Sequence, residues 1–168
     1  MHFEVDHVIR VPFSKYFDLV LSPDFNDWLK KRLNLIDRKI LRSEEIDGKL
    51  HRVVRAESQL VEAAQKFLKV ERLVIEERLV VDRAARSFTW EYVPNVAVNR
   101  FSATGRGRVE PIGANGDQTK RIIEGDVTMK LMLIGGRIER RLVEWIKENM
   151  GKAGDLLEEY HRSLQHSS

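Results

Sequence analysis

Histidine is the side chain best suited to moving protons or binding metals near neutral pH, and this sequence has five. No two of them are four residues apart and there is no H-E-x-x-H motif, so their spacing predicts no metal site. His7 differs from the others because it alternates with Phe3 and Val5 along a predicted strand, which places it on the apolar face. We expect His7 to reach an internal cavity, whereas the other histidines fit exposed or half-buried positions.

Glu77 is an acidic residue at a similarly unusual place. It shares the strand parity of Ile75 and Leu79, so its carboxylate is expected to point toward the apolar side. A carboxylate there is costly unless it is paired. We therefore expect Glu77 either to pair with an arginine inside a cavity or to be exposed by a bend of an edge strand.

Aromatic side chains alternate along another predicted strand. Phe88, Trp90 and Tyr92 lie on one face, and Phe101 stands on the strand that follows. Core packing alone explains such a pattern, but tryptophan and tyrosine also present a polar group beside an apolar body, as ligand cavities do. We interpret these residues as one wall of a binding cavity.

The elements that position these side chains are clearest in the last third of the chain. Over residues 122–133 every second residue is apolar or small, which indicates a strand with one dry face. After Gly135 and Gly136, apolar residues recur at the three-four spacing of a helix over 136–164. A long helix on a curved sheet either closes a core or covers a cavity. Its first turns and the preceding strand supply further candidate lining residues: Met129, Leu131, Ile138, Leu142, Trp145 and Ile146.

Small inward residues on the strands favour the cavity. Ala103, Gly105, Gly107 and Gly125 have the parity of the apolar face, and we expect them to leave room that a ligand fills. The rest of the chain predicts an opening strand, two short helices capped by Ser14 and by Ser22, and a series of strands joined by short turns. The expected strands cover 2–11, 37–43, 50–59, 71–81, 87–93 and 100–110, with a short helix over 61–68. Neighbouring strands with short turns are antiparallel, so an α+β class is predicted.

Three stretches resemble the START-like, helix-grip (SRPBCC) superfamily, which includes birch-pollen-allergen-like proteins, polyketide cyclases, START lipid-transfer domains and PRELI-like proteins. They are the opening strand into Pro-Phe-Ser, "SPDFNDWL", and above all "IIEGDVTMKLMLIGGRIERRLVEWI". The segment "EAAQKFL" is similar to an inserted helix in PRELI-like proteins and in an uncharacterised bacterial START-like family. The resemblance covers nearly the whole chain. It implies one START-like ligand-binding domain over 1–168: a curved antiparallel sheet of about six to seven strands around a C-terminal helix, with two short helices after the first strand.

The composition of the chain narrows the kinds of function and partner that remain. The 168 residues carry a net charge of only +3 with both signs mixed, which argues against nucleic acid as a partner. Cysteine is absent, there is no G-x-S-x-G motif, and the N-terminus has no continuous apolar run, so we expect a cytoplasmic protein without thiol chemistry. Arg137, Arg140 and Arg141 gather where the long helix begins. A solvated face explains them most simply, and peripheral contact with an anionic membrane surface is the alternative.

These patterns favour a non-enzymatic protein that binds a lipid or aromatic compound between the sheet and the C-terminal helix. No cofactor is expected, and the oligomeric state is left open. One alternative is an enzyme that resembles the polyketide cyclases, in which His7, Glu77 or Tyr92 would move a proton. Another is a protein-interaction module without a ligand. The superfamily has no invariant catalytic motif, so the resemblance implies a fold and not a reaction.

Overall fold

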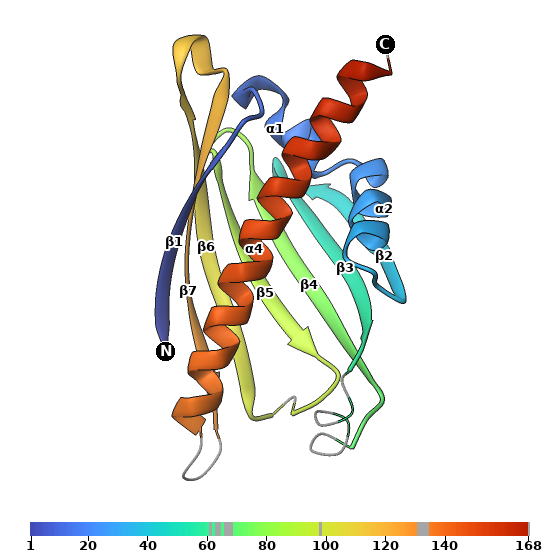
Figure 1. Cartoon of the computed structure of the whole chain (residues 1–168). Helices are drawn as coiled ribbons and strands as arrows, with labels where there is room; N and C mark the ends of the chain where they lie inside the picture. The colour runs from blue at the N-terminus through green and yellow to red at the C-terminus, as the bar shows by residue number, and fades with distance from the viewer. Residues whose placement is uncertain (61, 63–64, 66–68, 98, 131–134, 168) are drawn as a thin grey trace.

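The computed structural model describes residues 1–60, 62, 65, 69–97, 99–130 and 135–167. These residues form a curved antiparallel sheet in the order β1-β7-β6-β5-β4-β3-β2, with helices packed on one face (Figure 1). The elements in chain order are β1 (His2–Ile9), α1 (Phe13–Val20), α2 (Pro23–Arg32), β2 (Asp37–Ile46), β3 (Lys49–Gln59), β4 (Arg72–Asp82), β5 (Ser87–Pro94), β6 (Phe101–Ile112), the 3-10 turn η1 (Ala114–Gly116), β7 (Gln118–Met129) and α4 (Gly135–His166). The predicted helix-grip fold is confirmed.

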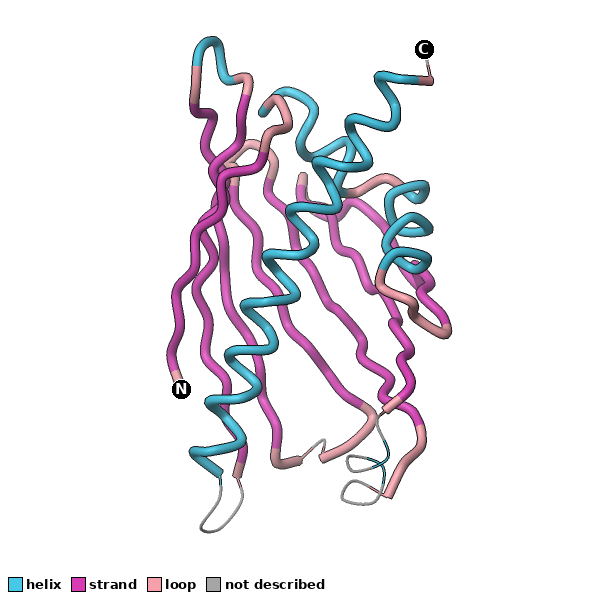
Figure 2. Tube along the Cα trace, in the orientation of Figure 1, coloured by secondary structure: helices cyan, strands magenta, loops and turns pink. Residues whose placement is uncertain are grey.

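The long helix α4 crosses the sheet diagonally. Figure 2 shows it running from the end of β7 toward the side of the molecule where α1 and α2 lie. Its first half therefore faces different strands from its second half. Within the described residues, no helix is both long and apolar enough to cross a lipid bilayer.

Local sequence explains most of the element boundaries. The Ser22 hydroxyl accepts a hydrogen bond from the Phe25 amide at 3.1 Å, and Pro23 opens α2, as expected for a capped helix start. Asp47 and Gly48 both have positive φ, 51° and 75°, which confirms the tight turn between β2 and β3. The cap predicted at Ser14 is wrong: extended backbone at Pro12 leads directly into α1, and no side chain of the described residues caps that helix.

The start of one predicted strand needs revision, and parts of two predicted elements lie outside the described residues. β7 begins at Gln118 rather than Ile122, because its pairing with β6 continues as far as Ile112. Residues 131–133 of that predicted strand, and most of the predicted helix over 61–68, lie outside the described residues. The boundary errors do not affect the face to which each side chain points.

The core consists of two clusters beneath different parts of α4. The first lies under α1, α2 and the second half of α4: Ile9, Val11, Tyr16, Phe17, Phe25, Leu29, Val81, Val109, Leu157 and Tyr160. The second lies under the first half of α4: Phe3, Trp90, Ala103, Ile123, Val127, Val143, Ile146 and Met150.

Aromatic rings fill the space next to the inward glycines. A Cβ on Gly105 would lie 2.6 Å from Cζ2 of Trp90, and the same ring lies over Gly125. The Phe88 ring covers Gly107 in the same way. The expectation that these glycines leave room for a ligand is therefore wrong: they let the second cluster pack, because only glycine admits a large ring so close to the backbone.

Candidate functional site

A cavity of about 270 Å³ lies beneath the middle of α4, between α1, α2 and the inner faces of β3, β4 and β5. We call it the α4 cavity. Both core clusters contribute to its wall, and most of its lining is apolar, including Phe17, Leu29, Val54, Ile75, Leu79 and Ala153. Four charged side chains of the sheet also line it and are at most partly exposed: Arg38, Arg52, Glu77 and Arg121.

Arg38 and Glu77 form a paired group on one wall. Arg38 Nη1 and Nη2 donate to the two Glu77 carboxylate oxygens at 2.9 and 2.7 Å, and Arg38 Nε donates to Asn26 Oδ1 at 3.0 Å. Two parallel bonds between a guanidinium and a carboxylate are a strong, directional pair. Burial lowers the pKa of Arg38, but the charge and hydrogen bonds of Glu77 outweigh it and raise that pKa. The expected arginine partner of Glu77 is confirmed.

Arg52 enters the same region from β3, and no carboxylate among the described residues pairs with it. Its side chain is buried, its Nη1 donates to the Leu21 carbonyl at 2.8 Å, and its buried Nε has no hydrogen-bond partner in the part of the chain that the structure describes. Burial is the main cause that lowers the pKa of Arg52, and the nearby positive charge of Arg38 lowers it further, against the opposing effect of Glu77. Arg52 therefore carries a charge that its surroundings disfavour.

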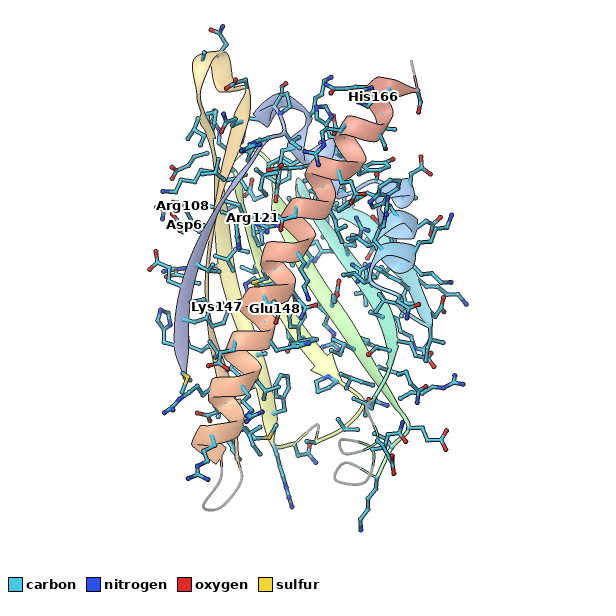
Figure 3. All side chains as sticks on the ribbon, viewed as in Figure 1. Asp6, Arg108, Arg121, Lys147, Glu148 and His166 are labelled. Atoms are coloured by element: carbon cyan, nitrogen blue, oxygen red, sulfur yellow. The ribbon has the colours of Figure 1, made fainter. Side chains whose placement is uncertain are left out.

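Arg121 reaches the cavity from β7, directly beneath α4. Its Nη2 donates to the Met150 carbonyl at 2.6 Å, and its buried Nε also finds no hydrogen-bond partner among the described residues. Figure 3 shows Arg121 beside the middle of that helix. A Cβ on Gly154 would lie 3.4 Å from Arg121 Nη2, so a glycine at this turn lets α4 pass close to the guanidinium.

Tyr92 lines the cavity from β5, which lies between the strands that carry Glu77 and Arg121. It is directly opposite Glu77 in the pairing of β4 and β5. Burial, and then the negative charge of Glu77, raise the pKa of Tyr92, while Arg38 and Arg121 act in the opposite direction. The phenol therefore stays protonated near neutral pH and can donate a hydrogen bond.

His7 contacts Arg121 and is not among the residues that line the α4 cavity. Its Nδ1 is 3.5 Å from Arg121 Nη2, and a Cβ on Gly151 would lie 3.4 Å from its Nε2. Burial and then the Arg121 charge lower the pKa of His7, against the effects of Asp155 and Asp6. Among the residues that the structure describes, no group of three or more acidic or histidine side chains is arranged to hold a metal.

A family model described as a protein of unknown function, DUF2505, matches residues 4–160. The chain belongs to the DUF2505 family. No curated protein matches its sequence.

The fold of this DUF2505 chain is shared with several solved structures. Ara h 8.0201 matches with a TM-score of 0.68 at 14% identity, over 97% of this chain and 98% of that one. The Zhui aromatase/cyclase from Streptomyces sp. R1128 matches at 0.63 and 15%, over 98% and 95%. A START superfamily protein from Mycobacterium smegmatis matches at 0.62 and 17%, over 97% and 98%. These likenesses confirm a START-like fold for the DUF2505 chain.

The structure brings together some of the predicted lining residues of the DUF2505 chain. Glu77, Phe88, Trp90, Tyr92 and Trp145 line the α4 cavity. Other predicted residues lie away from it: Phe101, Leu142 and Ile146 pack in or against the second core cluster, and Met129 and Ile138 are half-buried outside the lining. Leu131 lies outside the described residues. The cavity is displaced toward β3–β5, because aromatic rings fill the space under the first half of α4.

The arginines of the site were missed, although the sequence contained a signal for them. Arg52 alternates with Val54, and Arg121 alternates with Ile123, so both have inward parity. Arginine at such a position is rare without a partner. Strand parity alone therefore identifies Arg52 and Arg121 as candidates.

Proposed function

We propose that this chain binds an apolar small molecule in the α4 cavity. The observation that carries the proposal is a hollow of about 270 Å³ with a mostly apolar wall, beside two packed clusters. An engineered apolar cavity of about 150 Å³ already takes up benzene, so this one has room for a larger ring or a short chain. Affinity would come from apolar area removed from water, at about 25 cal/mol per Å².

Relatives with the same fold support the proposal in general terms. One is named an aromatase/cyclase and another a START superfamily protein, and identities of 15% and 17% connect them to this chain by fold alone. A lipid or an aromatic compound would fit the lining, in which Phe88, Trp90 and Trp145 offer aromatic surface.

Binding without reaction is favoured over a cyclase-like activity. A proton-transfer role needs an acid or base that is free to change its protonation. Glu77 is held by two hydrogen bonds from Arg38, and the raised pKa of Tyr92 keeps its proton in place. His7 contacts Arg121 and not the cavity.

Titration with the neutral fluorescent probe N-phenyl-1-naphthylamine would test the proposal. Saturable binding to the natural sequence is expected, together with a change in tryptophan emission, since Trp90 and Trp145 line the cavity. Ala56→Phe places a ring in the cavity and should weaken binding strongly, whereas Val8→Phe on the exposed side of β1 should not. Equal binding by all three proteins would place the probe elsewhere and contradict the proposal. Native mass spectrometry of protein from its own host would look for a co-purifying apolar molecule.

Contact with an anionic membrane stays a prediction. Arg137, Arg140 and Arg141 are exposed in the first turns of α4, where an anionic headgroup would reach them. Co-sedimentation with phosphatidylglycerol vesicles, which the double variant Arg140→Glu/Arg141→Glu should lose, would test it.

A further inference from the structure

The buried charges around the α4 cavity do not balance. The charges of Arg38 and Glu77 cancel in their paired group. Arg52 and Arg121 are only 5% and 7% exposed, and neither forms an ion pair with any described residue. Two positive charges are therefore left without a counter-charge in the wall of an apolar cavity, where a lone ion is costly.

Arg78 also lines the cavity but does not add to this excess. Its side chain is about half exposed, and it forms ion pairs with Glu76 and Glu91. Those partners screen it on the outside of the sheet. The excess charge belongs to Arg52 and Arg121.

Anchoring of the backbone does not account for these two guanidinium groups. Each donates to one carbonyl, that of Leu21 or that of Met150, and a neutral donor would serve equally well. A guanidinium has five N–H donors, and the bonds to the two carbonyls engage only Nη1 of Arg52 and Nη2 of Arg121. An unpaired donor on a buried charge suits a ligand that is an acceptor and carries a negative charge.

Tyr92 adds a neutral donor to the lining of the cavity. The charges of Glu77, Arg38 and Arg121 all act on its hydroxyl. The protonated phenol can donate to the same anion. Charged donors with one neutral O–H, in an otherwise apolar enclosure, form a site for an acid group at the end of an apolar body.

We propose that the occupant of the α4 cavity is an apolar acid, whose carboxylate or phosphate pairs with Arg52, with Arg121 or with both. This inference rests on the proposed function and specifies the class of ligand. The apolar part contacts the aliphatic and aromatic wall, and the acid group accepts hydrogen bonds from a guanidinium that lines the cavity.

Calorimetric titration with a matched series of ligands tests the inference. Decanoate, decyl phosphate and decanol share one alkyl chain and differ in the head group. Hydrogen bonds to charged groups predict that at least one of the two acids binds about ten- to a hundredfold more tightly than decanol. The better acid distinguishes a carboxylate ligand from a phosphate ligand.

Substitution of each arginine shows which of them causes the preference for the acid. Methionine in place of the arginine that holds the acid, as Arg52→Met or Arg121→Met, should bring the affinity for the acid close to that for decanol, with decanol binding kept. Arg52→Lys and Arg121→Lys should keep part of the preference, which covers the case in which a methionine variant does not fold. Arg106→Met, on an exposed arginine of β6, is the control and should change nothing.

The outcomes separate the two proposals. Equal affinity for the acids and decanol, or an acid preference that survives in both methionine variants and in their combination, overturns the inference but leaves apolar binding standing. Absence of binding by all three ligands and by N-phenyl-1-naphthylamine overturns the proposed function as well.

Discussion

The space between α4 and the sheet is filled beneath the first half of the helix and hollow beneath its middle. In the filled region the Trp90 ring covers Gly105 and Gly125, and the second core cluster closes around it. In the hollow region the wall carries arginines that point inward. The difference teaches that small inward residues do not by themselves create a cavity, because a large neighbour takes up the room they leave. In this molecule the hollow lies beside inward charges, which are costly to surround with apolar side chains.

The largest effect is expected for removal of the ring that fills the first region. Trp90 is buried and contacts Phe3 and Tyr92, with ring centroids 6.0 and 5.2 Å apart. Trp90→Ala should lower the free energy of unfolding by about 3–5 kcal/mol. Trp145→Ala is the matched change beside the hollow region, where the side chain is 43% exposed, and should cost under about 1 kcal/mol. Urea unfolding of both variants measures the difference, and equal losses would contradict the distinction between the regions.

The second-largest loss of stability is expected when the carboxylate of Glu77 in the hollow region is removed. Glu77→Gln leaves Arg38 buried without its counter-charge. Breaking a fully buried pair costs about 3–5 kcal/mol, and since Glu77 is partly exposed we expect about 2–3 kcal/mol. Glu44→Gln removes the exposed partner of Arg42 and should cost under about 1 kcal/mol. A Glu77→Gln protein as stable as Glu44→Gln would mean that the pair is screened by water.

Strand parity in the sequence predicts many of the residues that distinguish the two regions. Parity predicts that Glu77, Trp90 and Tyr92 point inward, and the α+β fold follows from the order of strands and helices. The place of the cavity does not follow, because it depends on which side chain covers each glycine across strands. Trp90 reaches over Gly105 and Gly125, one and two strands away in the sheet. The pairing of Arg38 with Glu77 likewise joins β2 to β4 across β3, a contact that no local pattern contains.

Enlarged side chains should also distinguish the filled region from the hollow region. The filled region should not accept added atoms, whereas the hollow region should. A Cβ on Gly125 would lie 2.8 Å from the Thr104 carbonyl oxygen and 2.9 Å from Trp90 Cη2, so Gly125→Ala should cost about 1–3 kcal/mol. Ala56→Val adds two methyl groups that face the hollow, and we expect it to change stability by under about 1 kcal/mol. Thermal and urea unfolding measure both. A tolerated Gly125→Ala would show that the Trp90 ring can move and that the filled region is adaptable.

The smallest effect is expected from His7, which reports on the charge of Arg121. Burial and then the Arg121 charge lower the pKa of His7 in the folded protein below its ordinary value of 6.5. The unfolded chain therefore holds more protons than the folded protein between these two pKa values, and stability rises with pH across this window. As the pH falls below about 6.5, the natural sequence should lose more stability than His7→Gln. His161, whose pKa burial also lowers, contributes equally to both proteins, so the difference isolates His7.

The same titration can identify the arginine that binds an acid. An anion on Arg121 would offset the positive charge next to His7 and move the His7 pKa upward, whereas an anion held by Arg52 alone would leave it unchanged. NMR titration of the His7 ring with and without saturating decanoate measures this shift, and decanol serves as the neutral control. A rise with decanoate only would place the acid at the Arg121 wall, beneath the turn of α4 that contains Gly151 and Gly154. An equal response to both ligands would attribute the shift to displaced water rather than to charge.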